Sequence, residues 1–169
     1  MRAFIKNYTS AVAIEQTIAR IEQRLSAIGA NSITKHYDSN HRVAALLFVV
    51  DLGDQHYTIR LPANADACFE ALWKDYRQKA RRIHSSAEQR IRDQAARTAW
   101  KIIQDWVDVQ ISLITMKQAD WIQVFMSYIW DGERQQTVYD LVRAGGFKSL
   151  PAATPLKQLA APRCKEIEV

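Results

Sequence analysis

The residues with the most evident chemical potential are the lysines and arginines between Lys74 and Lys101. This segment holds nine basic and three acidic residues, whereas the rest of the chain is close to neutral, with 14 basic and 15 acidic residues. Such cations displace counterions condensed on a phosphate backbone and bind nucleic acid without reading its sequence. The candidate phosphate-binding residues are Arg77, Lys79, Arg81, Arg82, Arg90, Arg97 and Lys101.

Two aromatic residues, Trp73 and Tyr76, stand beside the first of these cations. If exposed, their rings would stack on the bases of a single strand. The alternative is a solvated helix face, because acidic and basic residues stand four apart along the same segment. Those pairs are Glu88 with Arg92, Asp93 with Arg97, and Asp105 with Lys101.

A second aromatic group lies further along the chain. Its members follow the apolar period, which favours a core, but tryptophan also anchors protein interfaces. We therefore keep a protein partner or a second copy as an alternative, with Trp121, Phe125 and Trp130 as the candidate contacts.

Asp105 and Asp108 are three residues apart and share a helix face, where paired carboxylates can hold Mg²⁺. A charged, solvent-facing row on the helix is the favoured interpretation, because no third acidic ligand can be identified. The four histidines and two cysteines show no zinc spacing, and no glycine-rich phosphate loop or nucleophile elbow is present. We predict no catalytic residue, no metal site and no cofactor, and expect a protein that is not an enzyme.

The first half of the chain predicts one helix and three strands. A helical pattern follows Ser10 and ends at Gly29, with apolar residues three and four apart. Strands are expected at 33–37, 43–50 and 57–61, joined by turns at 38–40 and 53–54. The middle strand is almost wholly apolar, which is typical of a strand covered on both faces.

The second half is predicted to be helical, since no glycine or proline occurs from 63 to 131. Asn64 or Asp66 can cap one helix, and a long helix is expected after Ser86. Its apolar row Ile91, Ala95, Ala99, Ile102, Trp106, Val109, Leu113 and Met116 is widened by a second row, Ala96, Trp100, Ile103, Val107 and Ile114. The fold class is α+β: an N-terminal helix, a three-stranded antiparallel meander, then helices packed on the sheet. We expect one domain over 1–150 and a flexible, proline-containing tail over 151–169.

Composition excludes several classes of protein. With 48% hydrophobic and 24% charged residues, the chain is neither wholly disordered nor a fibre, and two cysteines make no disulfide framework. Cys68 and Cys164 are expected to be reduced thiols in a cytoplasmic protein. No signal peptide is evident at the start, and no 18-residue window lacks a charge, so we expect no membrane span.

Two stretches carry a resemblance to a known family. They are Ile5-Lys6-Asn7-Tyr8-Thr9-Ser10, and the segment from Ala99 to Trp106 followed by Gln110 to Ile114. Over about residues 5–151 the chain resembles small, uncharacterised proteins encoded by tailed phages and prophages. The resemblance implies a bacterial or phage-infected cytoplasm and a role in phage replication, recombination or counter-defence, and it implies no catalytic residues.

The leading hypothesis is a non-enzymatic accessory protein that binds nucleic acid, with DNA as the expected partner. The alternative is a protein interaction module, such as a phage inhibitor or a subunit of a larger assembly.

Overall fold

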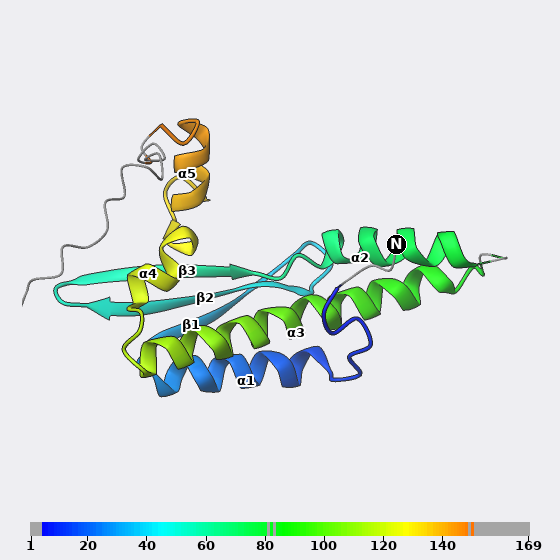
Figure 1. Cartoon of the computed structure of the whole chain (residues 1–169), viewed down its shortest axis with the longest axis horizontal. Helices are drawn as coiled ribbons and strands as arrows, with labels where there is room; N and C mark the ends of the chain where they lie inside the picture. The colour runs from blue at the N-terminus through cyan, green and yellow to red at the C-terminus, as the bar shows by residue number, and fades with distance from the viewer. Residues whose placement is uncertain (1–4, 81, 83, 149, 151–169) are drawn as a thin grey trace, which may run out of the picture.

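The body of the molecule is a three-stranded sheet with helices on one face (Figure 1). The structure is a computed structural model that describes residues 5–80, 82, 84–148 and 150. Helix α1 (Ile14–Ala27) precedes the strands β1 (Ser32–Tyr37), β2 (Val43–Leu52) and β3 (Gln55–Pro62). The strands form an antiparallel meander in the order β1-β2-β3, which confirms the predicted α+β fold.

Two turns set the register of this sheet. Asp38 closes the first, because its carboxylate accepts from the backbone N–H groups of Asn40 at 2.8 Å and Arg42 at 2.9 Å. The second is a two-residue turn in which Gly53 has a φ of +63°. That conformation favours glycine and lets β2 and β3 pair without a break.

The start of α1 differs from the prediction. The helix begins at Ile14 rather than just after Ser10, and Ala13 gives it no side-chain cap. Ser10 has another role: its carbonyl accepts a hydrogen bond from Gln94 at 3.0 Å. Nearby, the hydroxyl of Thr98 donates to the carbonyl of Asn7 at 3.2 Å. The residues before α1 are thus tied to a distant helix.

The core lies between the sheet and two helices. From β2, Leu46, Phe48 and Val50 are buried against α1 and against α3 (Ala87–Thr115). The intervening Leu47 and Val49 are only half-buried. The prediction that β2 is covered on both faces is therefore wrong in this respect, because α1 and α3 share one face of the sheet (Figure 1).

The remaining elements follow α3 and stand off the β3 side of the sheet (Figure 1). They are α4 (Trp121–Phe125), the 3₁₀ helix η1 (Met126–Tyr128), the short strands β4 (Trp130–Asp131) and β5 (Gln136–Thr137), and α5 (Val138–Ala144). The sequence analysis predicted a helical second half and did not anticipate the two-residue hairpin, whose strands carry no alternation of their own. The predicted tail at 151–169 lies outside the described residues.

Candidate nucleic-acid interface

The basic segment forms a projecting pair of helices, which we call the arm. It consists of α2 (Ala65–Lys79) and the first half of α3, residues 87–101, which lie side by side beyond the sheet (Figure 1). The arm ends where residues 80–86 connect α2 to α3. Along most of its length it consists of these two helices. The side chains on its outer faces are largely exposed.

Local sequence explains why α2 begins where it does. Asn64 caps the helix, because its side-chain oxygen accepts from the N–H of Ala67 at 3.0 Å. Proline at position 62 ends β3 and separates the strand from the helix. Of the two predicted caps, Asn64 is thus the one that the structure uses.

Small residues hold the two arm helices together. Ala95 and Ala99 of α3 are buried, and Cys68 and Phe69 are the buried residues of α2. The guanidinium of Arg92 lies 3.9 Å from the centroid of the Phe69 ring, which adds a cation–π contact across the pair. Burial also raises the pKa of the Cys68 thiol, so this cysteine is weakly reactive.

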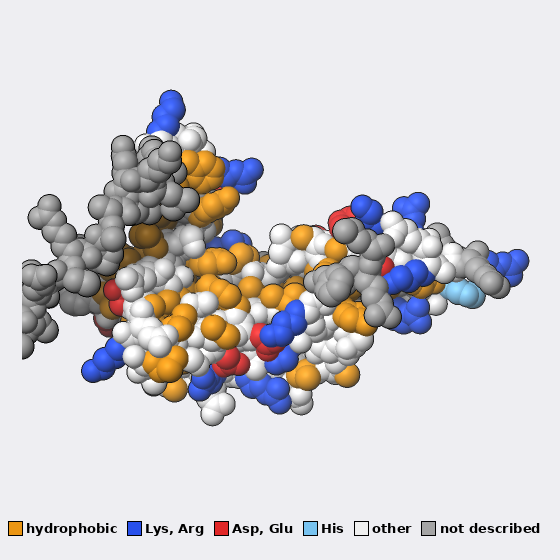
Figure 2. Space-filling view, in the orientation of Figure 1, with side chains coloured by type: hydrophobic (Ala, Val, Ile, Leu, Met, Phe, Trp, Pro, Cys, Tyr) orange, Lys and Arg blue, Asp and Glu red, His pale blue; other side chains and the backbone are white. Residues whose placement is uncertain are grey.

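Three of the predicted cations stand near the end of the arm and are exposed. Arg77 is two residues before the end of α2, Arg82 lies in the connection, and Arg90 is in the first turn of α3. None of the three has an ion pair with another described residue. We call them the tip cations. Figure 2 shows Lys and Arg side chains spread over this end of the molecule.

The other predicted cations are engaged within the chain. Lys79 pairs with Asp75, and Arg97 donates to Gln94 at 2.8 Å. Lys101 lies 3.0 Å from Asp105 and also donates to Gln104. The structure therefore separates this group from the tip cations. Arg81 lies outside the described residues.

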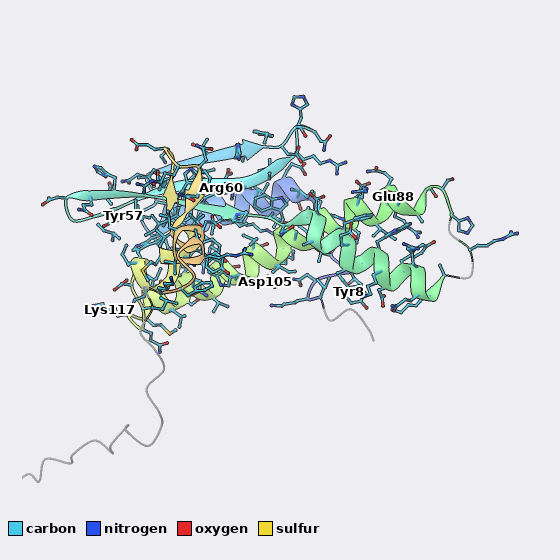
Figure 3. All side chains as sticks on the ribbon, turned by 90° about the horizontal axis from the view of Figure 1, so that it is seen from above. Tyr8, Tyr57, Arg60, Glu88, Asp105 and Lys117 are labelled. Carbon is cyan, nitrogen blue, oxygen red and sulfur yellow. The ribbon has the colours of Figure 1, made fainter. Side chains whose placement is uncertain are left out.

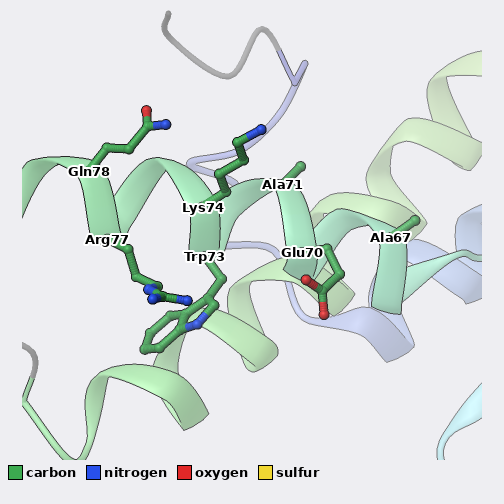
Figure 4. A pocket seen from close by; sticks show the side chains of 7 residues that line it. All are labelled: Ala67, Glu70, Ala71, Trp73, Lys74, Arg77 and Gln78. Atoms are coloured by element: carbon green, nitrogen blue, oxygen red, sulfur yellow. The ribbon is translucent and has the colours of Figure 1, made fainter.

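The predicted stacking residues are part of a ring ladder along α2. Trp73 lies between Phe69 and Tyr76, at centroid distances of 5.8 and 5.6 Å and with nearly parallel planes. Trp73 and Tyr76 are both half-buried. In Figure 4 the side chains of Trp73 and Arg77 extend on the same side of α2, over a shallow hollow lined by this one helix. The ladder stabilises the arm, and its faces are occupied by neighbouring rings.

An exposed aromatic residue that the sequence did not single out lies next to the arm. Tyr8 lines a groove of about 220 Å³ together with Tyr76, Lys79 and Gln94 (Figure 3). Two polar side chains of this groove are already bonded, Lys79 to Asp75 and Gln94 to Ser10 and Thr98. No sequence spacing could indicate the groove, because it joins residues about 70 apart.

Asp105 and Asp108 bind side chains of their own chain. Asp105 lies 2.8 Å from the ammonium of Lys6 and 3.0 Å from that of Lys101, and it accepts from the amide of Asn7 at 3.0 Å. Burial raises the pKa of Asp105, but these three hydrogen bonds outweigh it and hold the pKa well below its ordinary value. Asp108 pairs with Arg24 of α1 at 2.9 Å.

Both carboxylates therefore fasten neighbouring segments to α3. Asp105 holds the residues before α1, and Asp108 holds α1 itself. Each is neutralised by cations of the chain, so neither is set up to attract Mg²⁺. Among the residues that the structure describes, no group of three or more His, Cys, Asp or Glu could hold a metal ion.

The candidate interface aromatics lie mostly inward. Phe125 is fully buried among Phe48, Trp106 and Trp121, so it is a core residue and the prediction that it contacts a partner is wrong. Trp121 is half-buried in the same cluster. Trp130 is half-buried as well, with the guanidinium of Arg60 lying 4.9 Å from its ring centroid.

Comparisons with known proteins give no relatives. No protein-family model, no curated protein and no solved structure matches this chain. The resemblance to phage and prophage proteins stays a prediction. In the described part of the chain, no helix combines the length and the hydropathy that crossing a membrane requires.

Proposed function

We propose that this chain binds nucleic acid through the end of the arm without an enzymatic step. The expected ligand is duplex DNA. The observation that carries the proposal is the set of tip cations, which are exposed and have no acidic partner among the described residues. Charges left unpaired on a thin projection create a local positive potential that attracts a polyanion. Lys74, one turn before Arg77, is exposed as well and extends the same surface.

The ring ladder favours a duplex over a single strand. Binding of single strands relies on aromatic faces that are free to stack on bases. Here Trp73 is already stacked between two rings, and the three tip cations are arginines. Contacts to phosphates require no unstacked base, so a duplex backbone fits this surface better.

A charge-reversal variant tests the proposal. We expect wild-type protein to bind a fluorescently labelled duplex in anisotropy measurements, with log affinity falling linearly with log salt concentration. Reversal of two tip cations in Arg77→Glu/Arg82→Glu should flatten that slope by about two, as expected for two lost phosphate contacts. Thermal stability should hardly change, because both side chains are exposed.

The matched control reverses two exposed cations of the body, in Arg20→Glu/Lys117→Glu. This control has the same net charge as the tip variant and should keep most of the salt slope. No binding at low salt, or an equal loss in both variants, would contradict the proposal. Parallel titrations with single-stranded DNA and with RNA establish which nucleic acid is preferred.

We further propose an accessory role of the phage or prophage type in a bacterial cytoplasm, which the resemblance at residues 5–10 and 99–114 supports.

A protein partner is the second candidate, and α5 with the residues after it favours that role. No residue of α5 is buried, and Tyr139, Phe147 and Leu150 are exposed. The rings of Tyr139 and Phe147 are 6.2 Å apart, so they form one apolar patch. Pull-down from a bacterial lysate with Tyr139→Ser/Phe147→Ser beside the wild type tests this patch separately from the arm.

A further inference from the structure

The outer face of α3 carries an apolar stripe within the body that is only partly covered. It consists of Ile102, Trp106, Val109, Leu113 and Met116, which are separated alternately by four and three residues. Val109 is 57% exposed and Met116 is 58% exposed, while the other three are half-buried. Of those three, Trp106 packs one side of its ring system against Phe125 and Tyr128. Figure 2 shows hydrophobic side chains gathered over the body in front of α3 and α4. We call these five residues the α3 stripe.

The α3 stripe continues an interface that the arm already uses. Ile91, Ala95 and Ala99 precede it on the same helical row, and in the arm that row is packed against α2. Because α2 begins only at Ala65, it runs beside the row along the arm and not beyond Ala99 (Figure 1). Beyond Ala99, Phe125 and Tyr128 cover one side of the row at Trp106. The other apolar row, with Trp100 and Val107, faces the sheet. The α3 stripe thus extends a helix-packing surface past the end of its partner.

The spacing and the flanking charges fit a second helix. Alternation of four and three residues is the seam of a two-helix coiled coil. The acidic neighbours Asp105 and Asp108 are already paired with Lys6, Lys101 and Arg24. Bringing two such faces together therefore sets neither of these carboxylates unpaired against its copy, and it removes apolar side chains from water.

The α3 stripe is also nearly symmetric about Val109. Ile102 lies seven residues before Val109, and Met116 lies seven residues after it. Two copies with antiparallel α3 helices would place Ile102 against the Met116 side chain of the second copy, with Val109 on the twofold axis. A patch that complements itself in this way makes a closed twofold interface.

The position of α2 selects the antiparallel orientation. In a parallel pair, the α2 helices of both copies would occupy the same space in front of the row from Ile91 to Ala99. In an antiparallel pair, each α2 lies beyond the C-terminal end of the opposite α3. We propose that this chain forms a homodimer through the α3 stripe, with the two α3 helices antiparallel and the two arms pointing in opposite directions.

The expected affinity of this dimer is modest. The stripe spans 15 residues of helix, or roughly 21 Å at about 1.5 Å per residue. A contact between two helices over this length buries less area than a typical stable interface, which buries about 800 Å² on each partner. Sedimentation equilibrium of the full chain without nucleic acid, from about 5 to 500 μM, should therefore show a monomer–dimer equilibrium.

Charged substitutions in the stripe test the surface. Val109→Glu/Met116→Glu should remain monomeric over the whole concentration range, with its circular dichroism spectrum and melting temperature close to those of the wild type. Met126→Glu is the matched control, because Met126 is an exposed methionine outside the stripe. A wild type that stays monomeric at 500 μM, or equal dissociation of the control, would overturn the proposal.

Cysteine cross-linking tests the orientation, in a Cys164→Ser background. Oxidised Val109→Cys should give a disulfide-linked dimer, since the axis brings this position against itself. Met116→Cys alone should not cross-link, but it should cross-link when mixed with Ile102→Cys. Efficient cross-linking of Met116→Cys alone would contradict the antiparallel pair. None of these measurements requires nucleic acid, so their outcome is independent of the proposed function.

Discussion

Three side chains converge on the carboxylate of Asp105, and they come from two separate parts of the chain. Lys6 and Asn7 belong to the segment before α1, and Lys101 belongs to α3. We expect Asp105→Asn to lower the free energy of unfolding by about 1–2 kcal/mol, since charge-assisted bonds are lost and Lys6 is largely exposed. Urea denaturation at pH 7 measures this, with Asp54→Asn, an exposed turn carboxylate, as the control.

The same carboxylate gives a defined pH dependence. Its folded pKa lies below the ordinary value of 3.8, so its contribution to stability is complete above that value. As the pH falls below 3.8 towards the folded pKa, Asp105 becomes protonated and the contribution is lost. The stability difference between wild type and Asp105→Asn should therefore shrink between pH 4 and pH 2. A difference that stays constant over this range would assign the effect to packing.

Trp73 provides a residue-level test of packing against base stacking. Because its ring stacks on Phe69 and Tyr76, Trp73→Phe should keep both the arm and the salt-dependent binding of a duplex. Trp73→Ala should destabilise the chain by about 2–4 kcal/mol through loss of a large aromatic contact that is only half-buried. Binding of a duplex that falls in Trp73→Phe while the melting temperature is kept would instead indicate direct contact with a base.

At the level of elements, the cap of α2 decides how well the arm is formed. Asn64→Ala removes the hydrogen bond to the N–H of Ala67 and should cost about 1 kcal/mol. Asn64→Asp keeps an acceptor at the cap and should retain most of the stability. Equal loss in both variants, measured by thermal denaturation, would show that the cap contributes through the amide nitrogen rather than through the acceptor oxygen.

Much of this element order could be predicted from the sequence. The meander followed from alternation, from the turn at Asp38 and from the glycine at 53, all of which are local features. The start of α1 was missed, because Ser10 bonds to Gln94, 84 residues away. The second face of β2 was misjudged for a similar reason: an apolar run shows that a strand can be buried, but not which elements cover it.

The candidate site was predicted only in part. The excess of positive charge identified the arm, but i,i+4 spacing could not show that Lys101 is shared between Asp105 and Gln104, or that the tip cations are left unpaired. The inward position of Phe125 depends on Phe48 and Trp106, which come from distant elements. Tertiary contacts of this kind have no local pattern.

For the part of the molecule that the structure describes, the tip should be the first point of proteolytic attack. Arg77, Lys79 and Arg82 place exposed trypsin sites where the arm has only two helices to protect it. We expect limited trypsin digestion to cut there first, and excess duplex DNA to slow this cleavage. Cleavage after Lys148, at the other end of the molecule, should be unaffected and serves as the internal control. Equal protection of both sites would indicate general inhibition of the protease.

The two parts of helix α3 have different structural environments. Residues 87–93 are packed against α2, while residues 94–115 also contact the segment before α1, the sheet and α1. Opening of α2 exposes the backbone of the first stretch without disturbing the second. A single unbroken helix should therefore show two rates of amide hydrogen exchange, fast before Gln94 and slow around Val107 and Ile111. A ligand held at the arm would slow the first of these rates and leave the second unchanged.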